Sequence, residues 1–132
     1  TSGNMLLYVQ HDTLRVVSLA YAVHVRRDDV QAAIHALAEQ FDRMLHDYAR
    51  AGLDPINSCL EMRVTDVDRE EALGMPGAVP AVLSPWLPIN GSERVIWFDV
   101  VTTPGMPLAW QFYAEFEAWL WQRFPESVRP EW

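Results

Sequence analysis

The feature that most constrains the fold of this chain is one long segment whose apolar residues recur with helical spacing. Between Asp29 and Gly52 they return at steps of three and four residues, which predicts an amphipathic helix. The apolar positions are Val30, Ile34, Leu37, Phe41, Met44, Leu45 and Tyr48. Asp28 and Asp29 supply an N-cap and early negative charge, and Gly52 closes the helix. A helix that is apolar along one side must pack on a second layer, which the flanking segments have to supply.

Strand patterns lie on both sides of this helix. Residues 13–25 are rich in β-branched and apolar residues at period two, which predicts a long strand that bends near residues 18–22. Residues 60–65 alternate as a shorter strand. Residues 94–101 form a nearly uninterrupted apolar run, typical of a central strand covered on both faces, with Asp99 as the one charge inside the run.

A second helix and a long loop complete the pattern. Residues 108–124 carry a bulky apolar stripe at helical spacing, with Pro107 at the start and Pro125 at the end. Residues 66–91 are irregular and rich in proline and glycine. A loop of that length in a compact domain is usually a lid, a binding loop or a docking segment.

The order of elements predicts an α+β fold of the ferredoxin-like class. Strand, helix, strand, loop, strand and helix form the β-α-β-β-α part of a split βαβ layout, followed by a tail with no predicted partner strand. We therefore expect one domain over residues 1–132, with an antiparallel sheet and both helices on one face. If Leu60 and Met62 face the helices, Glu61 and Arg63 must face the opposite side of the sheet.

Composition and spacing exclude several classes of function. The chain has 18 acidic and 10 basic residues and a net charge of -8, so it lacks the basic footprint of a protein that binds nucleic acid or anionic membranes. Its one cysteine, Cys59, cannot form an internal disulfide. The four histidines are too scattered to share a metal, and each is expected at the surface or at a sheet edge. No metal site is predicted.

The short strand places two opposite charges side by side. Glu61 and Arg63 are two residues apart, so their side chains share one face at a separation of roughly 7 Å along the backbone. Such a pair is either a solvated surface pair of small energetic value or a charged pair that lines a cavity. The residues alone leave both interpretations open.

Three segments of the chain resemble a known family. Residues 6–16, residues 52–68 with the Glu-x-Arg strand, and the Arg-Pro-Glu-Trp ending at residues 129–132 are similar to the substrate-binding domain of type II cholesterol oxidases. These are flavoproteins related to vanillyl-alcohol oxidase. The resemblance runs through most of the chain in the same order. It implies that the chain is an excised or truncated cap domain of a larger two-domain flavoprotein.

The resemblance also implies a role for the charged pair. In that family the domain forms a roof over the flavin ring, while FAD is bound by a separate domain that this chain does not contain. Glu61 and Arg63 would then be catalytic residues close to the flavin and to the reacting carbon of the sterol. A permanent guanidinium charge suits an anionic reduced ring, and a carboxylate beside it could hold it or take a proton. The resemblance further suggests a secreted bacterial enzyme.

Three further residues are candidates for substrate binding. Pockets for large apolar ligands are lined by aromatic side chains with few polar groups, which makes Trp86 and Trp97 candidates. Asn57 is a polar candidate within reach of the sheet. The aromatic residues of the second helical stripe are instead assigned to the core.

The resemblance therefore implies the steroid-binding roof of an FAD-dependent cholesterol oxidase, which turns a 3-hydroxysterol into the 4-en-3-one with dioxygen as acceptor. Its partners would be the sterol and the FAD-binding domain of the same parent protein. The alternative is a non-enzymatic ferredoxin-like module that binds a small apolar ligand or forms a homodimer through its exposed sheet face. A flavin-binding domain upstream in the natural protein would separate the two.

We predict that the isolated 132-residue chain is colourless and redox-inactive after purification. Its sequence contains no glycine-rich segment of the kind that cradles a dinucleotide phosphate. An absorption spectrum of the purified chain tests this. A flavin band that persists after gel filtration would contradict the prediction.

Overall fold

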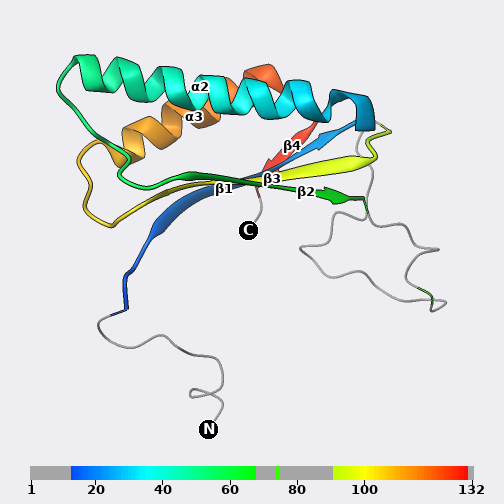
Figure 1. Cartoon of the computed structure of the whole chain (residues 1–132), viewed down its shortest axis with the longest axis horizontal. Helices are drawn as coiled ribbons and strands as arrows, with labels where there is room; N and C mark the ends of the chain where they lie inside the picture. The colour runs from blue at the N-terminus through cyan, green and yellow to red at the C-terminus, as the bar shows by residue number, and fades with distance from the viewer. Residues whose placement is uncertain (1–12, 68–73, 75–90, 131–132) are drawn as a thin grey trace, which may run out of the picture.

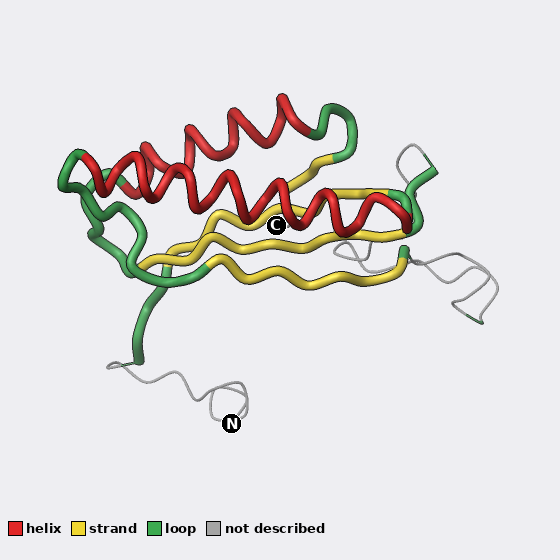
Figure 2. Tube along the Cα trace, turned by 45° about the horizontal axis from the view of Figure 1, so that its top comes forward, coloured by secondary structure: helices red, strands yellow, loops and turns green. Residues whose placement is uncertain are grey.

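The computed structural model describes residues 13–67, 74 and 91–130, and these form two layers (Figure 1). Two helices lie on one side of an antiparallel sheet, and the turned view in Figure 2 shows the same separation. The elements in chain order are β1 (Val17–Val25), η1 (Arg27–Asp29), α2 (Val30–Arg50), β2 (Leu60–Asp66), β3 (Arg94–Thr102), α3 (Ala109–Arg123) and β4 (Val128–Pro130).

The strand order within the described residues is β2-β3-β1-β4, and every neighbouring pair is antiparallel. β3 thus lies between β1 and β2, the two strands that α2 connects, which is the split βαβ arrangement. The predicted α+β, ferredoxin-like class with both helices on one face is confirmed.

The prediction of a tail without a partner is wrong. Residues Val128–Pro130 form β4, which pairs with Tyr21–Val23 of β1 and supplies the fourth strand. A three-residue strand that ends in proline has too few residues to show any periodicity in the sequence.

The first strand also differs from its prediction. β1 begins at Val17 rather than at residue 13, and its register with β3 runs without interruption from Val17 opposite Thr102 to Val25 opposite Arg94. The expected bend near residues 18–22 is therefore not marked by any bulge. Pairing along the full length of β3 keeps β1 regular.

The C-terminal end of α2 is set by a glycine, whereas its N-terminal end lacks the side-chain cap that the sequence predicts. Gly52 has φ +73° just after the helix, a backbone conformation that glycine adopts without steric cost. At the start, Asp29 occupies the N-cap position but its side chain makes no capping hydrogen bond. Its carboxylate instead pairs with Arg26, with 3.3 Å between Nε and Oδ2. A 3-10 turn at Arg27–Asp29 leads into the helix.

The core lies between the sheet and the two helices. Alternate residues of the strands face the helices and pack against the apolar stripes of α2 and α3. The largest side chains with almost no exposed surface are Phe98, Phe112, Phe116, Leu37, Ile96 and Leu120. Phe98 of β3 packs against Phe116 of α3, with 6.0 Å between the ring centroids. This assigns the aromatic stripe of the second helix to the core, as predicted.

We expect Phe98→Ala to lower the free energy of unfolding by about 3–5 kcal/mol, because it leaves a cavity in the centre of the core. Urea denaturation measures this change. Trp110→Ala is the control, since Trp110 is equally aromatic but 73% exposed on α3, and its effect should stay within about 0.5 kcal/mol. Equal losses for both variants would contradict this assignment of the layers.

Candidate functional site

The predicted site residues Glu61, Arg63 and Trp97 lie on the face of the sheet opposite α2 and α3, which we call the helix-free face. Leu60 and Met62 pack against the helical core, so the side chains between them point the other way. The register places Arg63 directly opposite Trp97 and Glu61 directly opposite Asp99. The orientation predicted for Glu61 and Arg63 follows from this alternation.

A charged cluster of Glu61, Arg63, Asp99 and Ser18 occupies three adjacent strands of this face. Arg63 Nη2 is 3.1 Å from Asp99 Oδ2, and Arg63 Nε is 3.4 Å from Glu61 Oε1. The Ser18 hydroxyl donates a hydrogen bond of 2.9 Å to Asp99 Oδ1. One guanidinium therefore contacts two carboxylates.

The two ion pairs of Arg63 lie in different surroundings. The side chains of Glu61 and Arg63 are each 55% exposed, whereas that of Asp99 is 15% exposed. An exposed pair such as Arg63–Glu61 contributes about 0.2–1 kcal/mol and is screened by salt. The contact with Asp99 is shorter and better shielded, so it is the firmer of the two. Arg63 keeps enough exposure to meet a group outside this chain.

Trp97 lies beside the charged cluster but is itself buried. Its indole Nε1–H donates a hydrogen bond of 3.0 Å to Thr65 Oγ1, and the guanidinium of Arg129 lies 5.7 Å from the ring centroid. With Ala22, Val67 and Val95 it forms a second apolar cluster, separate from the main core. A buried apolar cluster thus adjoins the charged groups on the helix-free face.

Asn57 is not brought together with the charged cluster. Its side-chain carbonyl accepts hydrogen bonds from Thr102 Oγ1 at 2.9 Å and from Thr103 N at 3.1 Å, and its amide donates to Thr103 Oγ1 at 2.8 Å. These bonds tie the α2–β2 connection to the end of β3. The binding role of Asn57 stays a prediction. Trp86 lies outside the described residues, so the structure does not place it.

The structure adds two residues that the sequence did not assign to the site. Asp99 was visible as the one charge within an apolar strand, but its partner depends on the register with β2. Ser18 shares a face with Asp99 only because Ser18 lies opposite Val101 in the β1–β3 ladder, two residues along β3 from Asp99. Cross-strand neighbours of this kind carry no signal in a single sequence.

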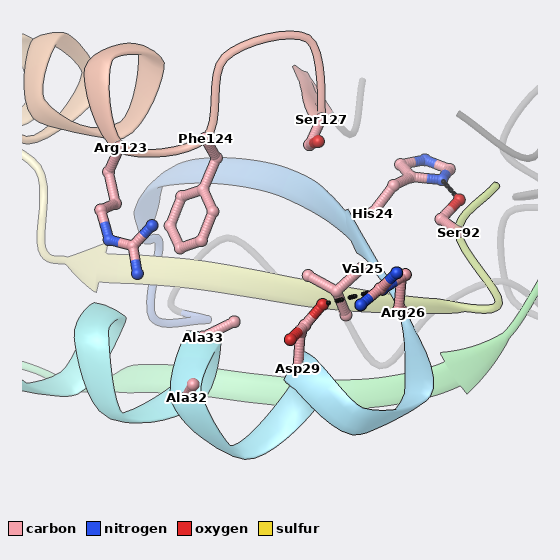
Figure 3. Close-up of a pocket in the computed structure, with 10 residues that line it drawn as sticks. All are labelled: His24, Val25, Arg26, Asp29, Ala32, Ala33, Ser92, Arg123, Phe124 and Ser127. Carbon is pink, nitrogen blue, oxygen red and sulfur yellow. Dashed lines mark hydrogen bonds and ion pairs between the residues drawn. The ribbon is translucent and has the colours of Figure 1, made fainter. Parts of the chain in front are cut away.

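A cavity of about 320 Å³ lies elsewhere, where the end of β1 meets the first turn of α2 and the end of α3 (Figure 3). The residues that line it are His24, Val25, Arg26, Asp29, Ala32, Ala33, Ser92, Arg123, Phe124 and Ser127. None of the charged cluster belongs to it. The guanidinium of Arg123 lies over the ring of Phe124, 4.9 Å from its centroid.

His24 is buried, so its expected surface or edge position is wrong. It is 2% exposed, and its Nδ1 lies 3.4 Å from Ser92 Oγ, the contact drawn in Figure 3. Burial, together with repulsion from Arg129, lowers the pKa of His24 from 6.5 to about 4. The imidazole is therefore neutral at pH 7. His24 lies opposite Val95 of β3, and on its other side its backbone N–H donates to Ser127 O at 2.7 Å, so the chain flanks it on both sides.

Within the stretches that the structure describes, no three potential ligands gather as a metal site. In the same stretches, neither helix is both long and apolar enough to cross a bilayer.

The fold and the helix-free face define an α+β domain that presents a compact charged cluster beside a buried apolar cluster. The family model for the substrate-binding domain of cholesterol oxidase matches residues 1–132, and the chain belongs to this family. The resemblance read from the sequence is thereby confirmed. No curated protein sequence matches the chain.

Solved structures give the same family. A solvent-stable cholesterol oxidase is 35% identical with a TM-score of 0.78, and the match covers 96% of this chain and 25% of that one. The crystal structure of cholesterol oxidase from B. sterolicum is 27% identical with a TM-score of 0.82, and the match covers 95% of this chain and 24% of that one. The chain thus spans about a quarter of the length of these relatives.

The burial of His24 predicts a loss of stability in mild acid. Its pKa is lower in the folded state than the unfolded value of 6.5, so the unfolded chain takes up a proton first as the pH falls from 6.5 towards 4. The contribution of neutral His24 to the free energy of unfolding is therefore complete above pH 6.5 and is lost as the pH falls towards 4. Between pH 7.5 and 5.5 we expect His24 to account for a loss of about 1.3 kcal/mol in the free energy of unfolding.

Urea denaturation of wild type and His24→Gln at both pH values measures this contribution. The variant should lose less stability over the interval, whatever its stability at pH 7.5. His35→Gln is the control, because His35 lies on α2 outside the set of buried residues. Identical pH dependence of wild type and His24→Gln would show that folding does not lower the pKa of His24.

Proposed function

We propose that this chain is the sterol-binding roof of an FAD-dependent cholesterol oxidase, which converts a 3-hydroxysterol into the 4-en-3-one and passes electrons to dioxygen. The observation that carries the proposal is the placement of Glu61 and Arg63. They lie together on the helix-free face, half exposed and next to the buried apolar cluster of Trp97, in a chain of the cholesterol oxidase substrate-binding family. A surface that faces a flavin and a sterol needs both features.

The residues of this face fit one side of a flavin ring and not the whole cofactor. Arg63 offers a permanent positive charge that can meet an electron-rich ring, and Trp97 lies directly opposite it in the β2–β3 ladder. The sequence has no glycine-rich cradle for the pyrophosphate, so a separate domain of the parent protein would hold FAD. FAD, when bound, would accept the hydride equivalent from the alcohol carbon and deliver electrons to dioxygen.

The chain's own residues would then have distinct tasks. Arg63 stabilises negative charge that develops on the side of the ring that it faces, because its guanidinium stays charged at every working pH. Glu61 is the more exposed of the two carboxylates that contact Arg63. That exposure suits it to hold or transfer a proton, which moving the sterol double bond requires.

The sterol would lie against apolar side chains near this cluster. Trp97 and Trp86 are the proposed aromatic contacts, and Asn57 the proposed polar contact. Trp97 is 8% exposed and its indole N–H already bonds to Thr65, so it would contact the sterol only through the small apolar part of the ring that stays exposed. A homodimer of the isolated chain through the same face stays a prediction.

In the full-length parent, Arg63→Ala should lower the rate of sterol oxidation or of flavin reoxidation at least tenfold. Loss of one preorganised charge raises the activation free energy by about 1.4 kcal/mol or more, and about 1.4 kcal/mol corresponds to a factor of ten in rate. Stopped-flow kinetics of the two half-reactions separates these steps. The control is Arg50→Ala, which removes a paired arginine from the other layer: Arg50 is 79% exposed and forms a 2.6 Å pair with Asp47 on α2. That control should leave both rates unchanged.

Glu61→Gln should slow the same step as Arg63→Ala, and the double variant should be less impaired than the product of the two single effects. Residues that share one interaction cannot lose it twice. Two small effects that multiply would point to a solvated ion pair and away from an active site.

A further inference from the structure

The carboxylate of Asp99 lies within a largely buried strand and has no role in the proposed function. It stands in the middle of β3, between Phe98 and Val100, both of which are fully buried. Placing a charge in such a strand is costly unless the charge is paired and hydrogen-bonded. Both oxygens of Asp99 have a partner, and the partners come from the two strands that flank β3.

The geometry gives Asp99 a firmer hold on Arg63 than Glu61 has. Asp99 has a short side chain, sits on the central strand, and is fixed on its far side by the 2.9 Å hydrogen bond from Ser18. Glu61 has a longer side chain on the outer strand and is 55% exposed. A short and shielded carboxylate with a second bond loses little freedom on pairing, whereas an exposed glutamate must be ordered for each contact.

We propose that Asp99 is the positioning residue for Arg63, with Ser18 orienting Asp99 in turn. The chain Ser18–Asp99–Arg63 runs across β1, β3 and β2 and sets where the guanidinium points on the helix-free face. This inference rests on the proposed function, because it assigns Asp99 to the reaction through Arg63. Asp99 itself need not touch the substrate.

The test uses the full-length parent oxidase with four single variants and one double variant. Asp99→Asn keeps the shape of the side chain and removes its charge, and Ser18→Ala removes only the orienting hydroxyl. Arg63→Ala provides the reference, alone and combined with Asp99→Asn. Asp66→Asn is the matched control, because Asp66 and Arg94 form a 2.9 Å aspartate–arginine pair between the same two strands but outside the charged cluster.

We expect Asp99→Asn to lower kcat about threefold to tenfold with a change in KM below about twofold, and Ser18→Ala to act on the same step more weakly. The double variant should be no slower than Arg63→Ala alone, because the role of Asp99 passes through Arg63. Asp66→Asn should leave kcat unchanged. A purely structural Asp99 would instead lower the melting temperature and multiply its kinetic effect with that of Arg63→Ala.

The outcomes separate this inference from the proposed function. If Arg63→Ala slows the reaction and Asp99→Asn does not, the positioning role is overturned while the proposed function stands. If Arg63→Ala has no effect, the proposed function fails and the role of Asp99 in the reaction fails with it. If Asp99→Asn does not fold, Ser18→Ala decides, because it leaves the carboxylate in place: a normal kcat in that variant overturns the proposal.

Discussion

Both faces of this domain depend on the antiparallel register of β3 between β1 and β2. Side chains alternate along each strand, so one register decides at once which residues enter the core and which meet on the opposite face. Phe98 lies opposite Tyr21 and Met62 on the helix side, and the next residue, Asp99, lies opposite Glu61 on the other. A slip by one residue would bury charges and expose the aromatic core. The strength of the core therefore also fixes the geometry of the charged cluster.

The elements with strong local signals were predictable from the sequence. The helical stripe from Val30 to Tyr48 and the apolar run of β3 repeat often enough to be recognised without any tertiary information, and the turn at Gly52 has a steric cause in its own backbone. β4 was not predictable in this way. Its three residues form a strand only because they pair with the side of β1 that β3 does not occupy, and that side exists only in the assembled sheet.

The contacts of the site were likewise predictable only where they depend on local spacing. That Glu61 and Arg63 share a face follows from their spacing within one strand. That Arg63 also meets Asp99, and Asp99 meets Ser18, depends on pairing between strands far apart in sequence. The burial of His24 has the same origin, because a histidine in an alternating strand is shielded or exposed according to what lies beside it. Local patterns thus predict orientation, and tertiary pairing decides partners.

The position of the charged pair on β2 has a consequence for solubility. Among the described residues β2 pairs with β3 alone, so its outer backbone groups form a sheet edge. Unprotected edges with apolar side chains invite pairing with a second sheet, and charged residues on such a strand discourage it. Val64 is 44% exposed between Arg63 and Thr65, which makes the flanking charge more important. The charged residues that form the cluster on this strand thus also protect its edge against aggregation.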